Sequence, residues 1–310
     1  MSALPVPGFA ALTELVLSAL SSAHTRRAYR HSLHSFFEWY TAAGRPTFDR
    51  TLLQSWRAEL QRRALAPSSI NVNLAAVRRL TNEAEAHGIL PPGTAAHINA
   101  TPGIRQQGIR AGNWLTADQA RRLLQSPDPS TTRGKRDCAI LALLVGCALR
   151  RAEVAALQST DIQLREGRWV IPDLLGKGNR LRTVPIPAWV KGMIDSWIAA
   201  APVSSGSLFR AIGKSGKLSP APLTERSIWQ IVRAHAAPLG FPDLAPHDLR
   251  RTCAKLCRAA GGDLEQIQFL LGHASILTTE RYLGSRQNLE TAVNDHLGIE
   301  PRVVANRAVD

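Results

Sequence analysis

The sequence predicts a mainly α-helical protein of two domains, with one small antiparallel β-sheet in the second domain. The chain has 310 residues, whereas a single domain usually has about 100 to 200. Hydrophobic residues make up 45% of the composition, which is too apolar for a disordered chain. Most segments place apolar residues three and four positions apart, as amphipathic helices do, and only three short stretches have a strand-like pattern.

The first domain, residues 1–95, is predicted to be a bundle of helices. A first helix is expected over residues 11–20. Thr25 is expected to cap a second helix, Asp49 caps a third, and Pro67 opens a fourth. The core is expected from the apolar stripes of the last three helices, which contain Tyr29, Leu33, Phe36, Phe37, Tyr40, Leu52, Leu53, Trp56, Leu60, Ile70, Leu74, Val77 and Leu80.

Residues 96–113 contain glycines and few large apolar side chains, which indicates a linker. The second domain, residues 114–310, opens with a capping-box pattern at Thr116 and Gln119. The uncharged apolar run 138–149 predicts a buried helix. Three strands are expected at 162–164, 169–171 and 182–185, followed by helices at 188–200, 224–236, 249–260 and 264–271.

Several classes of protein are disfavoured. The longest apolar run is far shorter than the roughly 20 residues that span a bilayer, so we expect no membrane segment. The first residues lack a basic region and carry Glu14, so we expect a cytoplasmic rather than a secreted protein. The four cysteines form no CxxC pair, which favours small buried hydrophobic residues over a zinc site or disulfides.

The charge predicts a polyanionic partner. The 38 basic and 24 acidic residues give a net charge of +14 and a pI near 10.7. Residues 1–110 and 111–310 are each basic, as expected if both domains contact double-stranded DNA. A set of arginines lies largely off the apolar stripes of the first domain and forms either a solvated face or a DNA-contacting face: Arg26, Arg27, Arg30, Arg62, Arg63, Arg78 and Arg79.

Four segments of the second domain carry residues suited to phosphate chemistry. They read ALRRAEVAAL (148–157), GKGNRLRTVP (176–185), HDLR (247–250) and LGHASILTTERY (271–282). Each is a weak signal alone, but their order and spacing together resemble the boxes of the tyrosine recombinase, or phage integrase, family. The first domain is similar to the core-binding, SAM-like domain of the simple two-domain members. The second is similar to their mixed α/β catalytic domain.

The resemblance implies a site-specific DNA recombinase that cleaves and rejoins strands through a 3′-phosphotyrosyl intermediate. By this resemblance Tyr282 is the nucleophile, Lys177 protonates the departing 5′ oxygen, and Glu153 supports the arginines. The task implied is integration, excision, inversion, transposition or resolution. The matched catalytic positions are Arg150, Lys177, His247, Arg250, His273 and Tyr282.

The residue types suit phosphate chemistry even when the family resemblance is set aside. Two guanidinium groups, on Arg150 and Arg250, can hold phosphate oxygens bidentately while charge develops. His247 lies three residues before Arg250 and shares a helical face with it. Surface ion pairs, structural histidines and a solvated turn lysine are the alternative roles of these side chains. No metal or cofactor is expected, because the four segments gather no carboxylate cluster and contain no P-loop.

The resemblance further implies a homotetramer on two paired DNA sites. The segment Asn288–Leu297 has one apolar stripe and is expected to form a tail helix, which docks on a neighbouring subunit or on its own domain. Two other functions stay open: a topoisomerase with the same tyrosine chemistry, and a DNA-binding protein whose site is idle. The sequence departs from the family pattern at Ala148, where glycine is common, and at Arg251, where a second histidine is frequent.

Overall fold

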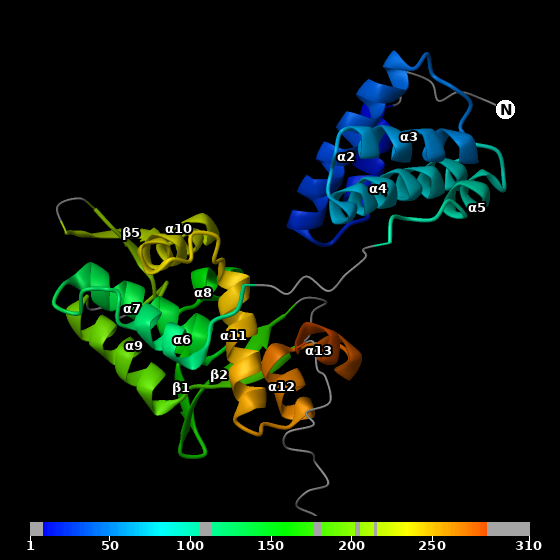
Figure 1. The fold of residues 1–310 in the computed structure, drawn as a ribbon. Coiled ribbons are helices and arrows are strands. Elements are labelled where there is room, and N and C mark those ends of the chain that lie inside the picture. The colour runs from blue at the N-terminus through cyan, green and yellow to red at the C-terminus, as the bar shows by residue number, and fades with distance from the viewer. Residues whose placement is uncertain (1–8, 106–112, 177–180, 202–204, 214–215, 284–310) are drawn as a thin grey trace, which may run out of the picture. The chain divides into compact units, whose positions relative to one another are not determined.

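The computed structural model describes residues 9–105, 113–176, 181–201, 205–213 and 216–283 (Figure 1). The chain forms two compact units, which divide between Gly108 and Ile109. Among the described residues the first unit is all helical, and the second is mainly helical with two small antiparallel sheets. The predicted fold class is confirmed, although only one of the two sheets was expected. None of the described helices is long and apolar enough to cross a bilayer.

Two helices of the first unit begin at a side chain that caps their first turn. Asp49 caps α3 as predicted, because its carboxylate accepts a hydrogen bond from the Leu52 amide at 2.9 Å. The predicted cap at Thr25 was wrong: Ser22 caps α2, and its hydroxyl accepts from the Thr25 amide. The elements are α1 (Phe9–Ser18), α2 (Ala23–Ala42), α3 (Arg50–Arg62), α4 (Pro67–Ala86) and α5 (Thr94–Asn99).

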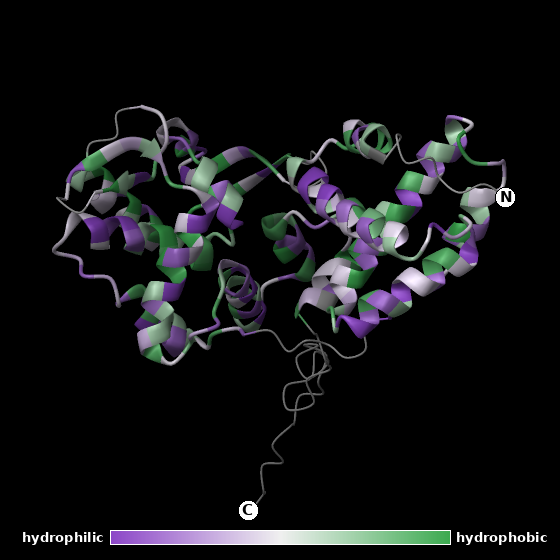
Figure 2. Cartoon of the chain, turned by 90° about the horizontal axis from the view of Figure 1, so that it is seen from above, coloured by the Kyte–Doolittle hydropathy of each residue, from purple (hydrophilic) through white to green (hydrophobic). Residues whose placement is uncertain are grey.

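Aromatic side chains fill the core of this unit. Phe36 and Trp56 are fully buried and meet edge to face, with ring centroids 5.7 Å apart. Phe36 also stacks on Tyr40 and meets Phe48 edge-on. In Figure 2 the helices carry hydrophobic and hydrophilic residues on different sides, which is the amphipathic pattern that predicted the bundle.

The end of the first unit is fastened to its helices. Asn71 of α4 makes two hydrogen bonds with the backbone of Ile104, at 2.8 and 2.9 Å. Arg57 and Arg78 donate to the carbonyls of Pro102 and Thr101. The segment predicted as linker from residue 96 therefore starts with the end of α5 and a stretch bound to α3 and α4. These bonds satisfy backbone groups that composition alone does not reveal.

The second unit is built around α7, whose residues from Ala139 to Leu144 are all completely buried. The strands β1, β2 and β3 form a three-stranded antiparallel sheet in chain order, in which Ile171 pairs with Val184. The elements are α6 (Ala117–Leu124), α7 (Thr132–Gly146), α8 (Arg151–Ala156), η2 (Ser159–Asp161), β1 (Gln163–Arg165), β2 (Arg168–Leu175), β3 (Leu181–Pro185), α9 (Ala188–Ala200), β4 (Arg210–Ile212), β5 (Leu218–Pro222), α10 (Glu225–Ala236), η3 (Ala237–Leu239), α11 (Pro246–Ala259), α12 (Leu264–Leu271) and α13 (Ile276–Leu283).

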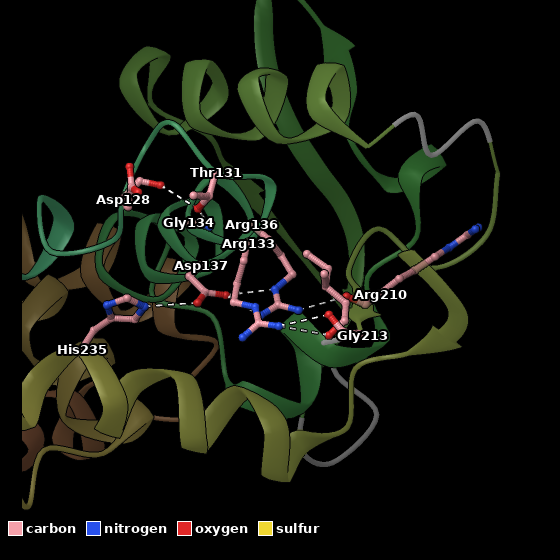
Figure 3. A network of polar contacts seen from close by, with 10 residues as sticks. Asp128, Thr131, Arg133, Gly134, Arg136, Asp137, Arg210, Gly213 and His235 are labelled. Carbon is pink, nitrogen blue, oxygen red and sulfur yellow. Dashed lines mark hydrogen bonds and ion pairs between the residues drawn. The ribbon is translucent and has the colours of Figure 1, made fainter. Parts of the chain in front are cut away.

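A buried polar network joins α7 to the unpredicted hairpin β4–β5 and to α10 (Figure 3). Asp137 accepts two hydrogen bonds from Arg136, and its other oxygen lies 3.2 Å from Nε2 of His235. Arg136 also donates to the carbonyl of Arg210 on β4. Because Arg136 and Asp137 are both buried, each needs these partners. The network fixes the hairpin to the core.

A smaller hydrophobic cluster holds α11, α12 and α13 together. Its buried members include Ala148, Cys253, Ile267 and Leu283, and Tyr282 packs against it. This cluster brings Ala148 of the ALRR box against α12, which leads into the LGH box, and against α11, which carries the HDLR box about one hundred residues further along the sequence. The chemistry predicted for these boxes is therefore brought to one place by the packing of three short helices.

Candidate active site

Three arginines converge on the end of α12. The carbonyl of Leu271 accepts hydrogen bonds from Arg150 and from Arg250, and the carbonyl of Leu270 accepts one from Nε of Arg182 at 3.1 Å. The last carbonyls of a helix have no partner within it and carry partial negative charge. The end of α12 thus binds the three cations that would otherwise repel one another.

Gly272 makes this approach feasible. It terminates α12 in the left-handed conformation, with φ +60°, which glycine adopts at little cost. A Cβ atom at this position would lie 2.8 Å from Cδ of Arg182. The LGH box therefore requires glycine both for its backbone and for the close packing of Arg182.

Glu153 neutralises part of the charge of the cluster. Its buried carboxylate, with the residue 8% exposed, accepts hydrogen bonds from the Arg150 side chain and from both terminal nitrogens of Arg182. It also accepts from the Arg150 amide at the start of α8, at 2.7 Å. Burial alone would raise the pKa of Glu153, but the hydrogen bonds from Arg182 and Arg150 lower it below the usual range.

Arg250 is the most buried of the three cations, with an exposed fraction of 1%. It donates to the carbonyls of Leu271 and Ala148. Ala148 has φ +51°, so its backbone has the left-handed conformation that glycine adopts more readily than other residues. Burial, followed by the nearby charges of Arg150 and Arg182, lowers the pKa of Arg250 to about 10. The guanidinium stays charged at neutral pH.

The ring of Tyr282 lies between two imidazoles. Its centroid is 5.5 Å from that of His247 and 5.3 Å from that of His273, and both pairs meet edge to face. The Tyr282 hydroxyl donates to the backbone carbonyl of His247 at 3.3 Å. His273 is oriented by Thr279, whose buried hydroxyl lies 3.0 Å from Nδ1 of the imidazole.

The surroundings of His247, His273 and Tyr282 favour the uncharged form of each side chain. Burial, then the charges of Arg250 and Arg150, lowers the pKa of His273 to about 4, and burial likewise lowers the pKa of His247. Burial raises the pKa of Tyr282 to about 12 even though Arg250 and Arg251 lower it. Both imidazoles and the phenol are therefore uncharged at pH 7.

The structure brings together Arg150, His247, Arg250, His273 and Tyr282, the matched residues that lie within the described ranges. Lys177 lies outside the described residues. Two neighbours were not predicted as site residues: Arg182, the second arginine of the GKGNRLRTVP box, and Thr279, which lies between His273 and Tyr282. Side chains alternate along a strand, so Arg182 lies on the same side of β3 as the buried Val184. This alternation could have indicated that Arg182 faces the core of the domain. Across the described residues, no cluster of three or more metal-ligating side chains is present.

The arginines of the first unit are mostly engaged locally. Arg62 and Arg63 both bind Glu59 and lower the pKa of its carboxyl to about 2. Arg78 donates a hydrogen bond to the Thr101 carbonyl. The remaining partners are Glu14 for Arg30, Glu83 for Arg79 and the Leu20 carbonyl for Arg26. Of these contacts, the ion pair between Arg30 and Glu14 is exposed on both sides, and such a pair contributes little stability.

Comparison with known proteins identifies the family. The Phage integrase family model matches residues 113–288, and the model of the phage integrase N-terminal SAM-like domain matches residues 12–88. Tyrosine recombinase XerC of Xanthomonas campestris pv. campestris (strain B100) is 30% identical over 275 residues, which are 87% of this chain and 81% of that protein. XerC of Mycobacterium bovis (strain BCG / Pasteur 1173P2) is 30% identical over 279 residues, covering 86% and 90%. The chain belongs to the phage integrase family.

Solved recombinases share the fold. XerH site-specific recombinase bound to a palindromic difH substrate has a TM-score of 0.69 at 21% identity, covering 84% of this chain and 76% of that one. The Tn1549 transposon integrase in complex with circular intermediate DNA has a TM-score of 0.67 at 14% identity, covering 90% and 96%. With the family established, the chain is a tyrosine recombinase, an enzyme of site-specific DNA recombination, whose family reacts through a phosphotyrosyl intermediate.

Proposed function

We propose that Tyr282 attacks the scissile phosphate and leaves the DNA strand attached to the enzyme through its 3′ phosphate. The phenol oxygen forms a bond to phosphorus while the bond from phosphorus to the 5′ oxygen breaks. The proposal is supported by the position of the Tyr282 ring between His247 and His273, beside the arginine cluster. This juxtaposition is the observation that carries it.

The arginine cluster is suited to hold the phosphate. Arg150, Arg182 and Arg250 carry three positive charges against the single negative charge of Glu153, so two positive charges remain for a phosphate. A guanidinium has five N–H donors. The hydrogen bonds of Arg250 to the Ala148 and Leu271 carbonyls occupy two of them, so others stay available for phosphate oxygens. Such fixed donors need little reorganisation as charge develops.

The proton of Tyr282 has to leave as the new bond forms. With a pKa of about 12, only about one phenol in 10⁵ is ionised at pH 7. His247 is the proposed acceptor, because its imidazole is neutral and its own carbonyl already holds the Tyr282 hydroxyl. His273 is proposed to donate from Nε2 to the phosphate, because Nδ1 is oriented by Thr279.

Replacing Tyr282 with Phe tests the nucleophile. The incubation uses a nicked duplex selected from a random-sequence library for binding to the wild-type chain, so that the cleaved end is lost and the covalent complex accumulates. Wild type should form an SDS-stable adduct, and Tyr29→Phe, which removes another hydroxyl, should form it equally. Tyr282→Phe should bind the duplex but form no adduct. An adduct with Tyr282→Phe would exclude Tyr282 as the nucleophile.

Lys177 is proposed as the acid that protonates the departing 5′ oxygen. A leaving thiolate needs no such proton. Lys177→Ala should therefore be strongly impaired on an ordinary selected duplex and nearly normal on one with sulfur at the 5′ bridging position. Equal impairment on both duplexes would remove Lys177 from this role.

The enzyme is further proposed to grip duplex DNA with its first domain (residues 1–95) and its catalytic domain (residues 114–310), and to act as a homotetramer on two paired sites. The net charge of +14 supports the grip on DNA. The predicted tail helix Asn288–Leu297 lies outside the described residues. A chain that ends at Ser285 should bind one selected site normally but fail to pair two sites or exchange strands. Undiminished exchange would show that the tail does not mediate assembly.

A further inference from the structure

Arg251 contacts the proposed nucleophile. It follows Arg250 on α11, and its guanidinium carbon lies 5.0 Å from the centroid of the Tyr282 ring. Its Nε is buried without a hydrogen-bond partner within the ranges that the structure describes. Arg250, by contrast, is held by two backbone carbonyls. Stacking on Tyr282 is therefore the contact that accounts for the orientation of Arg251.

The Tyr282 ring has three neighbours of different kinds. His247 and His273 meet it edge to face, whereas the cation of Arg251 lies over it. A cation over an aromatic ring is attracted by the electron density of its face. The attraction increases when the phenol becomes anionic, since the ring then carries part of the negative charge.

We propose that Arg251 is a positioning residue for the nucleophile: it holds the phenol ring of Tyr282 between the two histidines and stabilises negative charge on it during the attack. The inference rests on the proposed role of Tyr282. In that step the oxygen of Tyr282 bonds to phosphorus, its proton passes to His247, and the 5′ oxygen departs with a proton from Lys177. Arg251 exchanges no proton and forms no bond to the DNA.

Other charged groups near Tyr282 also shift the pKa of its phenol. Arg250 acts in the same direction as Arg251 and lowers the pKa of the phenol, whereas Asp248 and Cys253 raise it. All four groups lie on α11. The imidazoles of His247 and His273 face the ring but are neutral at pH 7. Within the part of the chain that the structure describes, Arg251 differs from Arg250 in that no backbone carbonyl fixes its position.

The test measures the phenol directly, in the full-length protein without DNA. A fluorinated tyrosine, which ionises nearer neutral pH, is incorporated at position 282, and its phenolate absorbance is titrated. The variants are Arg251→Gln, Arg251→Met, Arg251→Lys and the matched control Arg258→Gln, which removes an exposed arginine from the same helix. Either neutral substitution at Arg251 should raise the phenol pKa by roughly 0.5 to 1.5 units. Arg251→Lys should preserve most of the wild-type value, and Arg258→Gln should change nothing.

The rate of adduct formation on the selected duplex provides a second readout. Arg251→Gln should slow the enzyme with ordinary tyrosine on the order of tenfold. It should slow the fluorotyrosine enzyme less, because that phenol requires less stabilisation. An unshifted titration in both neutral variants would overturn the proposal, and a loss of DNA affinity without a shift would assign Arg251 to DNA phosphates instead. A shifted titration in a chain that never forms an adduct would refute the nucleophile and leave the stacking role intact.

Discussion

Replacing Gly272 with Ala tests whether the end of α12 organises the arginine cluster. Two penalties are expected. An L-residue in the left-handed conformation costs about 1 kcal/mol relative to glycine. The new Cβ would also lie 2.8 Å from Cδ of Arg182, whose nearly buried side chain is held by the Leu270 carbonyl and by Glu153. Moving Arg182 would break at least one hydrogen bond of a charged group, worth about 1.5 to 3 kcal/mol.

Gly261 provides the matched control. It also has a left-handed backbone, with φ +83°, but a Cβ atom there would meet nothing within 4 Å. Gly261→Ala should therefore lower the free energy of unfolding by about 1 kcal/mol, and Gly272→Ala by about 3 kcal/mol. Denaturant unfolding measures both losses, and adduct formation on the selected duplex should fall only in Gly272→Ala. Equal losses in the two variants would refute the packing of Arg182 against Gly272 as the reason for the glycine.

Three further predictions concern the charges. Glu153→Ala leaves buried guanidiniums without their carboxylate and should cost about 3 to 5 kcal/mol in denaturant unfolding, whereas exposed Glu166→Ala should cost little. The pKa of His273 is lowered from 6.5 to about 4 in the folded protein, so the unfolded state binds the proton first. Stability should fall as the pH drops from 6.5 towards 4, and fall less steeply in His273→Gln. Arg27 is exposed and has no ion-pair partner among the described residues, so Arg27→Ala should reduce the log–log salt slope of DNA binding by about 0.9 if it contacts a phosphate.

The sequence was most informative where local patterns decide the structure. Apolar periodicity predicted α1 to α4 of the first unit but not α5, because burial of one face dominates the stability of a short helix. Start signals were reliable for α3 and for α6, whose Thr116 and Gln119 form the predicted capping box. The resemblance, which covers the four boxes together, pointed to Arg150, His247, Arg250, His273 and Tyr282, which the structure brings together, but it did not point to Arg182 or Thr279.

Features that depend on partners distant in sequence were missed. Nothing near Arg182 in the sequence indicates that its guanidinium meets Glu153, which lies 29 residues away. The hairpin β4–β5 depends on a network from α7 and has two short strands with little apolar alternation. The stretch after α5 resembled a linker in composition, yet Asn71 binds its backbone from 33 residues away. Local periodicity carries no information about such long-range hydrogen bonds.

The departure at Ala148 illustrates how the site tolerates a change that its motif would disfavour. With φ +51° the backbone there is that of a glycine, and strain of about 1 kcal/mol is expected from the methyl group. The methyl is fully buried in the cluster that holds α11, α12 and α13 together, and burying one such group gains roughly 0.8 kcal/mol. The two effects nearly cancel, so Arg250 keeps the Ala148 carbonyl as an acceptor without a glycine. What the structure requires at this position is the direction of the carbonyl that Arg250 binds, and the left-handed backbone of Ala148 supplies it.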